Sequence, residues 1–338
     1  MYGNRRNNNS GKHINSLTIC FNILIVIFLT TIISCTSLDN NADSYDGIIF
    51  NEITFVGANR DKGFNYGYYY YVPQSIIDSP NKFIFVEPLN SPNNTNSVSQ
   101  LRSAALRIVR RNIENANLLN FAILVPIYGF RASSSETMHV WPLCRETLLL
   151  RTGNLARVDL QLISMIDDLK ERSLKEEFEL EPKILISGFS SSGRFAIRFS
   201  AIHPELIQAV AAGGLAITIL PLADLNSVTL NYPIGIADLY DITGESFNSE
   251  AFNNIPKFIY IGSQDNTNDP VRGPAYGGMA INQIHNLLGA NIISRFNHAR
   301  MIYEQQGTAA QFRIYEGVGH VITDQMRIDI REFLTENM

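Results

Sequence analysis

The sequence predicts an α/β domain in which a mostly parallel β-sheet is flanked by helices on both faces. Short runs of β-branched and apolar residues alternate with longer stretches in which apolar residues recur every three or four positions. Three of the short runs, at 183–189, at 257–261 and just before Gly317, lead into turns rich in glycine and small polar residues. Strands that alternate with helices in this way are joined by right-handed crossovers, which leave both faces of the sheet covered.

The length and composition allow one large domain with a full core. The chain has 338 residues, of which 45% are hydrophobic and 17% are charged, an ordinary balance for a globular protein. Its formal net charge is −5, and the first 34 residues hold only basic charges, so the remainder of the chain is more acidic still. A surface of that sign argues against nucleic acid as a partner.

Residues 1–34 have the layout of an export signal. A basic, asparagine-rich start is followed by an apolar run over 17–33 and then by Ser34 and Cys35. This layout resembles a bacterial lipoprotein signal peptide, which implies that Cys35 carries the lipid and anchors the chain in the membrane. The folded part would then be an extracytoplasmic lipoprotein of the cell envelope.

A tether is expected to join that anchor to the folded domain. Residues 35–47 are rich in serine, asparagine and aspartate, and the domain is predicted over 48–338. An uncleaved membrane helix is the alternative for the amino end, because about 18 apolar residues nearly span a bilayer. Asn22, Thr30 and Thr31 weaken a permanent span, and this favours the signal peptide.

The first half of the domain is predicted to open with a hairpin. Residues 48–57 and 65–73 are rich in β-branched and aromatic residues on either side of a polar turn. A short buried strand over 83–86, an amphipathic helix that starts near Val98 and a strand over 121–127 follow. Residues after this strand, as far as 150, show no clear periodicity, so we expect an irregular stretch there.

The second half is predicted to continue the alternation of helices and strands. An amphipathic helix over 155–169 leads to the strand at 183–189, which is followed by another helix. A strand of small residues over 209–212 and the strand over 257–261 come next, with a long polar region between them. A closing helix that turns Met326, Ile330 and Phe333 inward completes the domain.

The turn that follows the 183–189 strand points to chemistry. Ser190 comes directly after this strand, and Gly188 stands two positions before it. A serine on a sharp bend between a buried strand and a helix is held away from the backbone, where a base and a substrate carbonyl can reach its hydroxyl. The N–H groups at the start of the helix would point at the oxyanion that attack creates.

The turn departs from the usual nucleophile pattern at one position. Ser192 stands where a glycine is expected, two places after the nucleophile, and the glycine comes one place later, at Gly193. That position packs closely against a neighbouring strand, and serine is the next smallest polar choice. Taking Ser191 as the nucleophile would put Phe189 where the turn needs a glycine, so Ser190 is the better assignment.

A base and an acid follow in two later loops. His320 ends the glycine-containing segment Gly317-Val318-Gly319-His320 after a strand-like run, the setting that an oriented yet mobile base requires. Asp265 follows the strand 257–261 at the usual spacing from a strand end. Asp269, shortly after it, is the alternative acid.

The serine, the aspartate and the histidine, in this order and each after a predicted strand, resemble the α/β-hydrolase superfamily. The resemblance covers nearly everything after residue 48. It implies that Ser190, Asp265 and His320 form a catalytic triad at the carboxyl ends of the parallel strands.

The resemblance also implies an oxyanion hole. One donor would be the backbone N–H of Ser191, and the second would be a backbone N–H in the loop after the strand 83–86, at about Leu89 or Asn90. The side chain of Asn90 is an alternative donor, and a role in the turn is the other interpretation of this asparagine.

By the same resemblance, the protein would be a serine esterase similar to polyester depolymerases. It would hydrolyse a carboxylic ester, of a small molecule or a polymer, through an acyl-enzyme intermediate, and 215–255 would hold lid or cap elements that limit substrate size. Two other functions remain open. One is a serine peptidase on the same fold, and the other is a lipoprotein that uses the fold for binding without catalysis.

No cofactor or metal is expected. The sequence has no metal-ligand cluster, no phosphate-cradling glycine loop and no nicotinamide fingerprint. Of the three cysteines, Cys20 would leave with the signal and Cys35 would carry the lipid. Cys144 would then be the only cysteine of the folded part, so no disulfide is predicted and we interpret Cys144 as a buried small hydrophobe.

Overall fold

A computed structural model describes residues 46–90, 97–129, 142–266, 278–279 and 281–338. The chain divides into two units, 1–41 and 42–338, and every described residue lies in the second. The predicted signal peptide, Cys35 and most of the predicted tether lie outside the described residues. Among the helices within the described ranges, none is long and apolar enough to cross a membrane.

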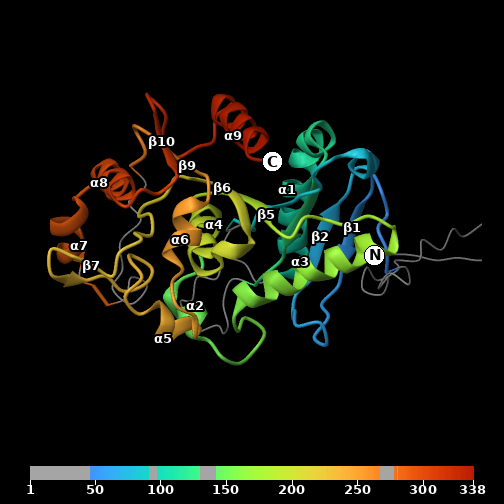
Figure 1. Ribbon diagram of the computed structural model, residues 1–338, viewed down its shortest axis with the longest axis horizontal. Coiled ribbons are helices and arrows are strands. Elements are labelled where there is room, and N and C mark those ends of the chain that lie inside the picture. Colours follow the sequence, from blue (N-terminus) through green and yellow to red (C-terminus); the bar gives the residue numbers. More distant parts are fainter. Residues whose placement is uncertain (1–45, 91–96, 130–141, 267–277, 280) are drawn as a thin grey trace, which may run out of the picture. The chain divides into compact units, whose positions relative to one another are not determined.

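The second unit is built on an eight-stranded sheet (Figure 1). The first two strands form the predicted hairpin, and the second of them is also antiparallel to its other neighbour. All the remaining pairings in this sheet are parallel. In spatial order the strands are β1 (Ile53–Val56), β2 (Tyr68–Tyr71), β4 (Ala122–Pro126), β3 (Ile84–Val86), β5 (Ile184–Phe189), β6 (Ile207–Gly213), β9 (Lys257–Gly262) and β10 (Ala310–Tyr315).

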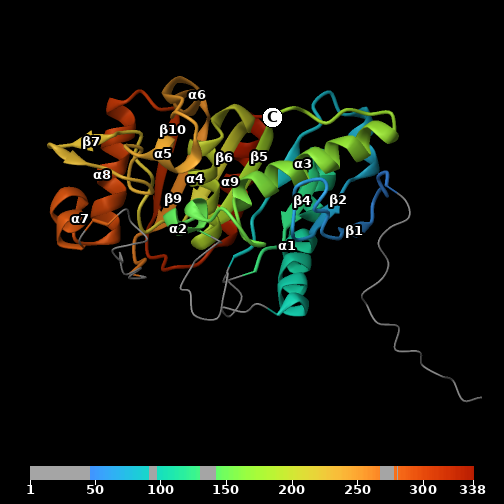
Figure 2. The same cartoon turned by 90° about the horizontal axis from the view of Figure 1, so that it is seen from below.

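Helices pack on both faces of this sheet, as Figures 1 and 2 show. One face is covered by α1 (Val98–Leu119) and α9 (Asp324–Glu336). The other face is covered mainly by α3 (Val158–Lys175), α4 (Ser191–Ile202) and α8 (Ile292–Gln305). The shorter helices are α2 (Arg145–Leu149), α5 (Leu239–Thr243), α6 (Ser249–Asn254) and α7 (Ile281–Leu288).

The continuous apolar run of strand β5 packs against the helices on both faces of the sheet. Ile184 and Ile186 belong to the hydrophobic cluster that includes α3, α4 and α8, whereas Leu185 belongs to the cluster that includes α1 and α9. Successive side chains of a strand point to opposite faces, so a strand that is buried on both sides needs apolar residues at every position. The predicted fold class is therefore confirmed by the sheet and its two helical layers.

Two regions differ from the expectations. No helix was predicted over 281–305, where the structure has α7 and α8. The start of α8 is marked by Asn291, whose side chain accepts a hydrogen bond from the backbone N–H of Ser294 at 2.8 Å.

The region 215–255 contains a small hairpin and two short helices. The hairpin strands are β7 (Asp224–Leu225) and β8 (Val228–Thr229). Ile219 and Leu220 are only 1% exposed and belong to the core, so the start of this region is part of the domain's packing. A lid function for the region stays a prediction.

Candidate active site

The backbone at Ser190 is held in a strained conformation at the turn between β5 and α4. Its φ is 61° and its ψ is −120°, a region that non-glycine residues rarely adopt. The turn is tight on both sides: a Cβ on Gly188 would lie 2.4 Å from the backbone of Ser192, and one on Gly193 would lie 2.7 Å from the carbonyl oxygen of Gly213. Glycine at these two positions lets the bend form.

Ser192, the residue that departs from the usual pattern, ties this turn together. It is 2% exposed. Its Oγ accepts a hydrogen bond from the N–H of Phe189 at 3.0 Å and donates one to the carbonyl oxygen of the same residue at 2.9 Å. The N–H of Ser190 donates to the carbonyl oxygen of Gly213 on β6 at 2.8 Å. The serine hydroxyl at 192 therefore supplies hydrogen bonds that a glycine could not.

His320 lies between Ser190 and Asp265. Its Nε2 is 2.9 Å from Ser190 Oγ, and its Nδ1 is 2.8 Å from Asp265 Oδ2. The Asp265 side chain is fully buried, whereas that of His320 is 25% exposed. The ring of Phe189 lies 4.8 Å from the imidazole, centroid to centroid, and packs against it. The imidazole is thus fixed by two polar contacts and one aromatic contact and still faces solvent on one side.

The loops that carry Asp265 and His320 are joined directly to each other. They extend from β9 and β10, which pair in parallel from Lys257 to Gly262. Beyond the paired strands, the N–H of Ser263 donates to the Tyr315 carbonyl oxygen and the N–H of Gln264 to that of Val318, both at 2.9 Å. The Ser263 hydroxyl accepts a hydrogen bond from the N–H of Gly317, also at 2.9 Å. These bonds fix the distance between acid and histidine.

The predicted oxyanion donors lie around the same turn. Ser191 is the first residue of α4, and the N–H groups of a helix's first turn have no acceptor within the helix. Asn90, in the loop after β3, donates from Nδ2 to the carbonyl oxygen of Phe189 at 3.0 Å. This bond holds the loop against the turn that carries Ser190, and it uses one of the two N–H groups of the amide that is the alternative donor. Leu89 beside it is 1% exposed.

The sequence also singles out Asp269 and Cys144. Asp269, the alternative acid, lies outside the described residues. Cys144 is a buried free cysteine, and burial raises the pKa of its thiol. Within the described ranges, no cluster of His, Cys, Asp and Glu side chains is placed to hold a metal ion.

A second contact between a histidine and a buried aspartate lies at the other end of α4. Asp159, fully buried on α3, binds Arg157 Nη2 at 2.7 Å and His203 Nε2 at 3.0 Å. Burial favours the neutral carboxyl, but the hydrogen bonds from His203 and Arg157 outweigh it and lower the pKa of Asp159 to about 2. The carboxylate therefore joins α3 to the residue that follows α4.

Comparison with solved structures identifies the fold. Poly(aspartic acid) hydrolase-1 from Sphingomonas sp. KT-1 matches with a TM-score of 0.54 and 14% identity, over 84% of this chain and 98% of that one. A poly(3-hydroxybutyrate) depolymerase from Bordetella parapertussis matches with a TM-score of 0.47 and 16% identity, over 80% of this chain and 84% of that one. An S-formylglutathione hydrolase from Staphylococcus aureus matches with a TM-score of 0.43 and 13% identity, over 84% and 97%.

No protein-family model matches the chain, and the search of curated proteins gave no match. The sheet order, the helices on both faces and the match to the Sphingomonas structure together define the α/β-hydrolase fold. At 14% identity the likeness concerns the fold alone.

Proposed function

We propose that this protein is a serine hydrolase that cleaves carboxylic esters. One observation carries the proposal: His320 lies within hydrogen-bonding distance of both the Ser190 hydroxyl and the buried Asp265 carboxylate. A serine hydroxyl is a poor nucleophile at its own pKa, and an adjacent base that is oriented by a third group activates it. The strained turn presents the hydroxyl to that base.

In this proposal the reaction has two halves. Ser190 Oγ attacks the ester carbonyl carbon while His320 Nε2 takes the hydroxyl proton. The tetrahedral intermediate collapses, the bond to the alcohol oxygen breaks, and His320 returns the proton to the departing alcohol. Water then attacks the acyl-enzyme with His320 again as the base, and the acid leaves as Ser190 recovers its proton. Asp265 fixes the imidazole tautomer and stabilises the imidazolium that forms in each half.

The oxyanion of each intermediate needs donors close to Ser190. We assign these roles to the backbone N–H of Ser191 and to a backbone N–H of the loop at Leu89 or Asn90. The hydrogen bond from Asn90 to Phe189 supports the second assignment, because it holds this loop against the turn. Losing one such donor typically costs about 3 kcal/mol of transition-state stabilisation.

We propose esters rather than amides as the substrates because the sequence resembles serine esterases of the α/β-hydrolase superfamily. The Sphingomonas protein is named for poly(aspartic acid), a polymer joined by amide bonds, so amide substrates belong in the assay panel beside the esters. We also propose that the domain is tethered outside the cytoplasm through lipidated Cys35, on the layout of the first 35 residues.

Hydrolysis of p-nitrophenyl esters, peptide p-nitroanilides and poly(aspartic acid) tests the proposed function. We expect turnover of the esters by the wild type and by Ser103→Ala, which changes an exposed serine on α1. Ser190→Ala and His320→Ala should each lose ester turnover by at least about 10³-fold. Faster turnover of the amides than of the esters would identify a peptidase, and equal rates in all four proteins would remove Ser190 from the reaction.

A further inference from the structure

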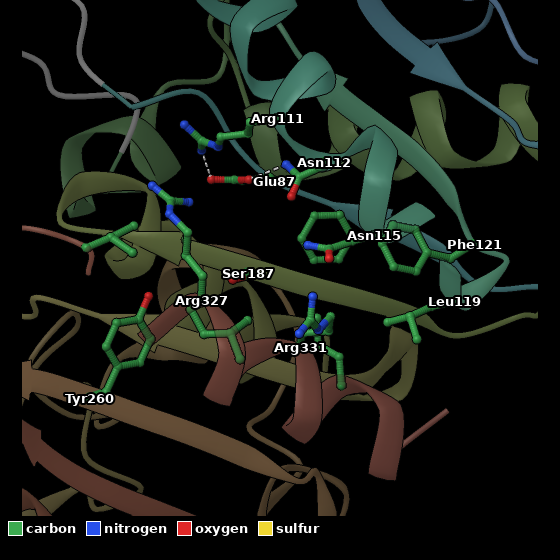
Figure 3. Close-up of a pocket in the computed structure, with 15 residues that line it drawn as sticks. Glu87, Arg111, Asn112, Asn115, Leu119, Phe121, Ser187, Tyr260, Arg327 and Arg331 are labelled. Carbon is green, nitrogen blue, oxygen red and sulfur yellow. Dashed lines mark hydrogen bonds and ion pairs between the residues drawn. The ribbon is translucent and has the colours of Figure 1, made fainter. Parts of the chain in front are cut away.

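A pocket whose lining includes none of the residues proposed for hydrolysis lies on the sheet face covered by α1 and α9 (Figure 3). It encloses about 640 Å³, including its open mouth. Its lining comes from β3, β5, β9 and the two helices. Ser187 and Gly188 of β5 and Ile322 are the lining residues closest in sequence to Ser190 and His320.

Positive charge exceeds negative charge around this pocket. Arg111, Arg327 and Arg331 line it, together with a single carboxylate, Glu87. Both oxygens of Glu87 are already bound, one by Arg111 and the other by Asn112 Nδ2 at 2.7 Å. Within the described part of the chain, the guanidinium groups of Arg327 and Arg331 form no hydrogen bond or ion pair. These two arginines are one turn apart on α9, so they can act on the same anion.

Two residues that are mostly buried direct their hydroxyl groups into the pocket. Ser187 is 6% exposed and Tyr260 is 1% exposed, and among the described residues neither hydroxyl has a hydrogen-bond partner. Figure 3 shows both in the pocket, with the Tyr260 hydroxyl directed toward its interior. Burial and the nearby Glu87 raise the pKa of Tyr260, so its hydroxyl stays protonated and can donate. Neither hydroxyl oxygen belongs to the fully buried side-chain atoms that lack a partner, so both are reached from the pocket and can bond to a ligand atom there.

Much of the remaining lining of the pocket is apolar, and the side chain of Asn115 on α1 is the polar group beside it. Five side chains from β3, α1, the residue before β4 and α9 form an apolar wall: Phe85, Leu119, Phe121, Ile330 and Leu334. An inorganic anion would leave this wall without a partner, and an uncharged apolar molecule would leave the guanidinium groups without one. A ligand with an anionic group and an apolar body matches both parts.

We propose that this pocket is a binding site for an organic carboxylate that carries a short aliphatic chain or a ring. The carboxylate is bound by Arg327 and Arg331 and accepts hydrogen bonds from the hydroxyls of Ser187 and Tyr260. The apolar body packs on the wall formed by α1, α9 and the adjoining strands. The site is separate from the proposed hydrolytic site, and binding to it does not require Ser190 to be reactive.

Titration calorimetry with hexanoate as the probe tests this site, with 1-hexanol and inorganic phosphate as matched comparisons. We expect saturable binding of hexanoate that is at least about tenfold tighter than binding of either comparison. The double variant Arg327→Gln/Arg331→Gln should weaken hexanoate binding by at least about tenfold, and Tyr260→Phe should weaken it by about threefold or more. Arg110→Gln, an exposed arginine of α1 outside the pocket, should leave it unchanged.

Hexanoate could also bind as a reaction product beside Ser190, and the variants distinguish the two sites. Ser190→Ala should retain hexanoate binding if the pocket is the site. Binding that Ser190→Ala loses, or that Arg327→Gln/Arg331→Gln retains, would overturn the proposal, as would no binding to the folded wild type. Phosphate binding as tight as that of hexanoate would refute an organic ligand. Thermal unfolding of each variant verifies its fold, and Tyr260→Phe keeps the ring that packs on its neighbours.

Discussion

Replacing Asp265 by asparagine tests how much the buried carboxylate contributes. Asp265 Oδ2 lies 2.8 Å from His320 Nδ1, and its side chain is fully buried. With charge centres about 4 Å apart and an effective dielectric constant near 20, the attraction between carboxylate and imidazolium is about 4 kcal/mol. A neutral amide in its place cannot supply this attraction when the imidazolium forms. Because solvent reaches a quarter of the His320 side chain, we expect kcat to fall by about 10²- to 10³-fold.

The assay is steady-state hydrolysis of a p-nitrophenyl ester by purified variants. Asp61→Asn, in an exposed loop after β1, is the matched control and should keep the wild-type kcat. The double variant Ser190→Ala/Asp265→Asn should be no slower than Ser190→Ala alone, because the residues act as one unit. A kcat within about threefold of wild type for Asp265→Asn, with its fold intact, would refute the role assigned to this carboxylate.

Three further predictions concern stability and the proposed membrane anchor. Lys257, 1% exposed, donates to the carbonyl oxygens of Phe252 and Ile255, and burial lowers its pKa to about 7. Between pH 7 and about 10 the unfolded chain then binds more protons than the native one, so the free energy of unfolding should rise with pH, by at most about 4 kcal/mol. Urea unfolding at pH 7 and 10 should show this rise in the wild type and not in Lys257→Met. Asp159→Asn should lower the free energy of unfolding by about 3 kcal/mol, since Arg157 loses its buried partner; an unchanged urea midpoint would contradict this. Cys35→Ala should abolish incorporation of radiolabelled palmitate in a bacterial host and release the protein from membranes, whereas Cys144→Ala should not.

The site could be predicted from sequence because its residues lie at strand ends. Ser190 directly follows β5, whereas Asp265 and His320 lie in the loops that follow β9 and β10, and parallel strands bring their carboxyl ends to one edge of the sheet. What the pattern could not decide was the acid, since Asp265 and Asp269 both follow β9. The structure places the carboxylate of Asp265 beside His320, and Asp269 lies outside the described residues.

Other features depend on contacts that no local pattern records. The two hydrogen bonds of Ser192 to Phe189 explain why serine fits where glycine is usual, but they require the turn's geometry to be known. The pocket between α1 and α9 brings together Ser187, Tyr260 and Arg327, which are far apart in the chain and ordinary when taken singly. Helix α8 differs, because its start is marked locally by Asn291, whose side chain accepts a hydrogen bond from the N–H of Ser294.

Peptide mapping by mass spectrometry after treatment with a fluorophosphonate tests the central claim most directly. The reagent reacts with serines that an adjacent base has activated. We predict a single phosphonyl adduct, located on Ser190, that is absent from both Ser190→Ala and His320→Ala. An adduct on another residue, or an unmodified Ser190 in a protein that hydrolyses esters, would contradict the account.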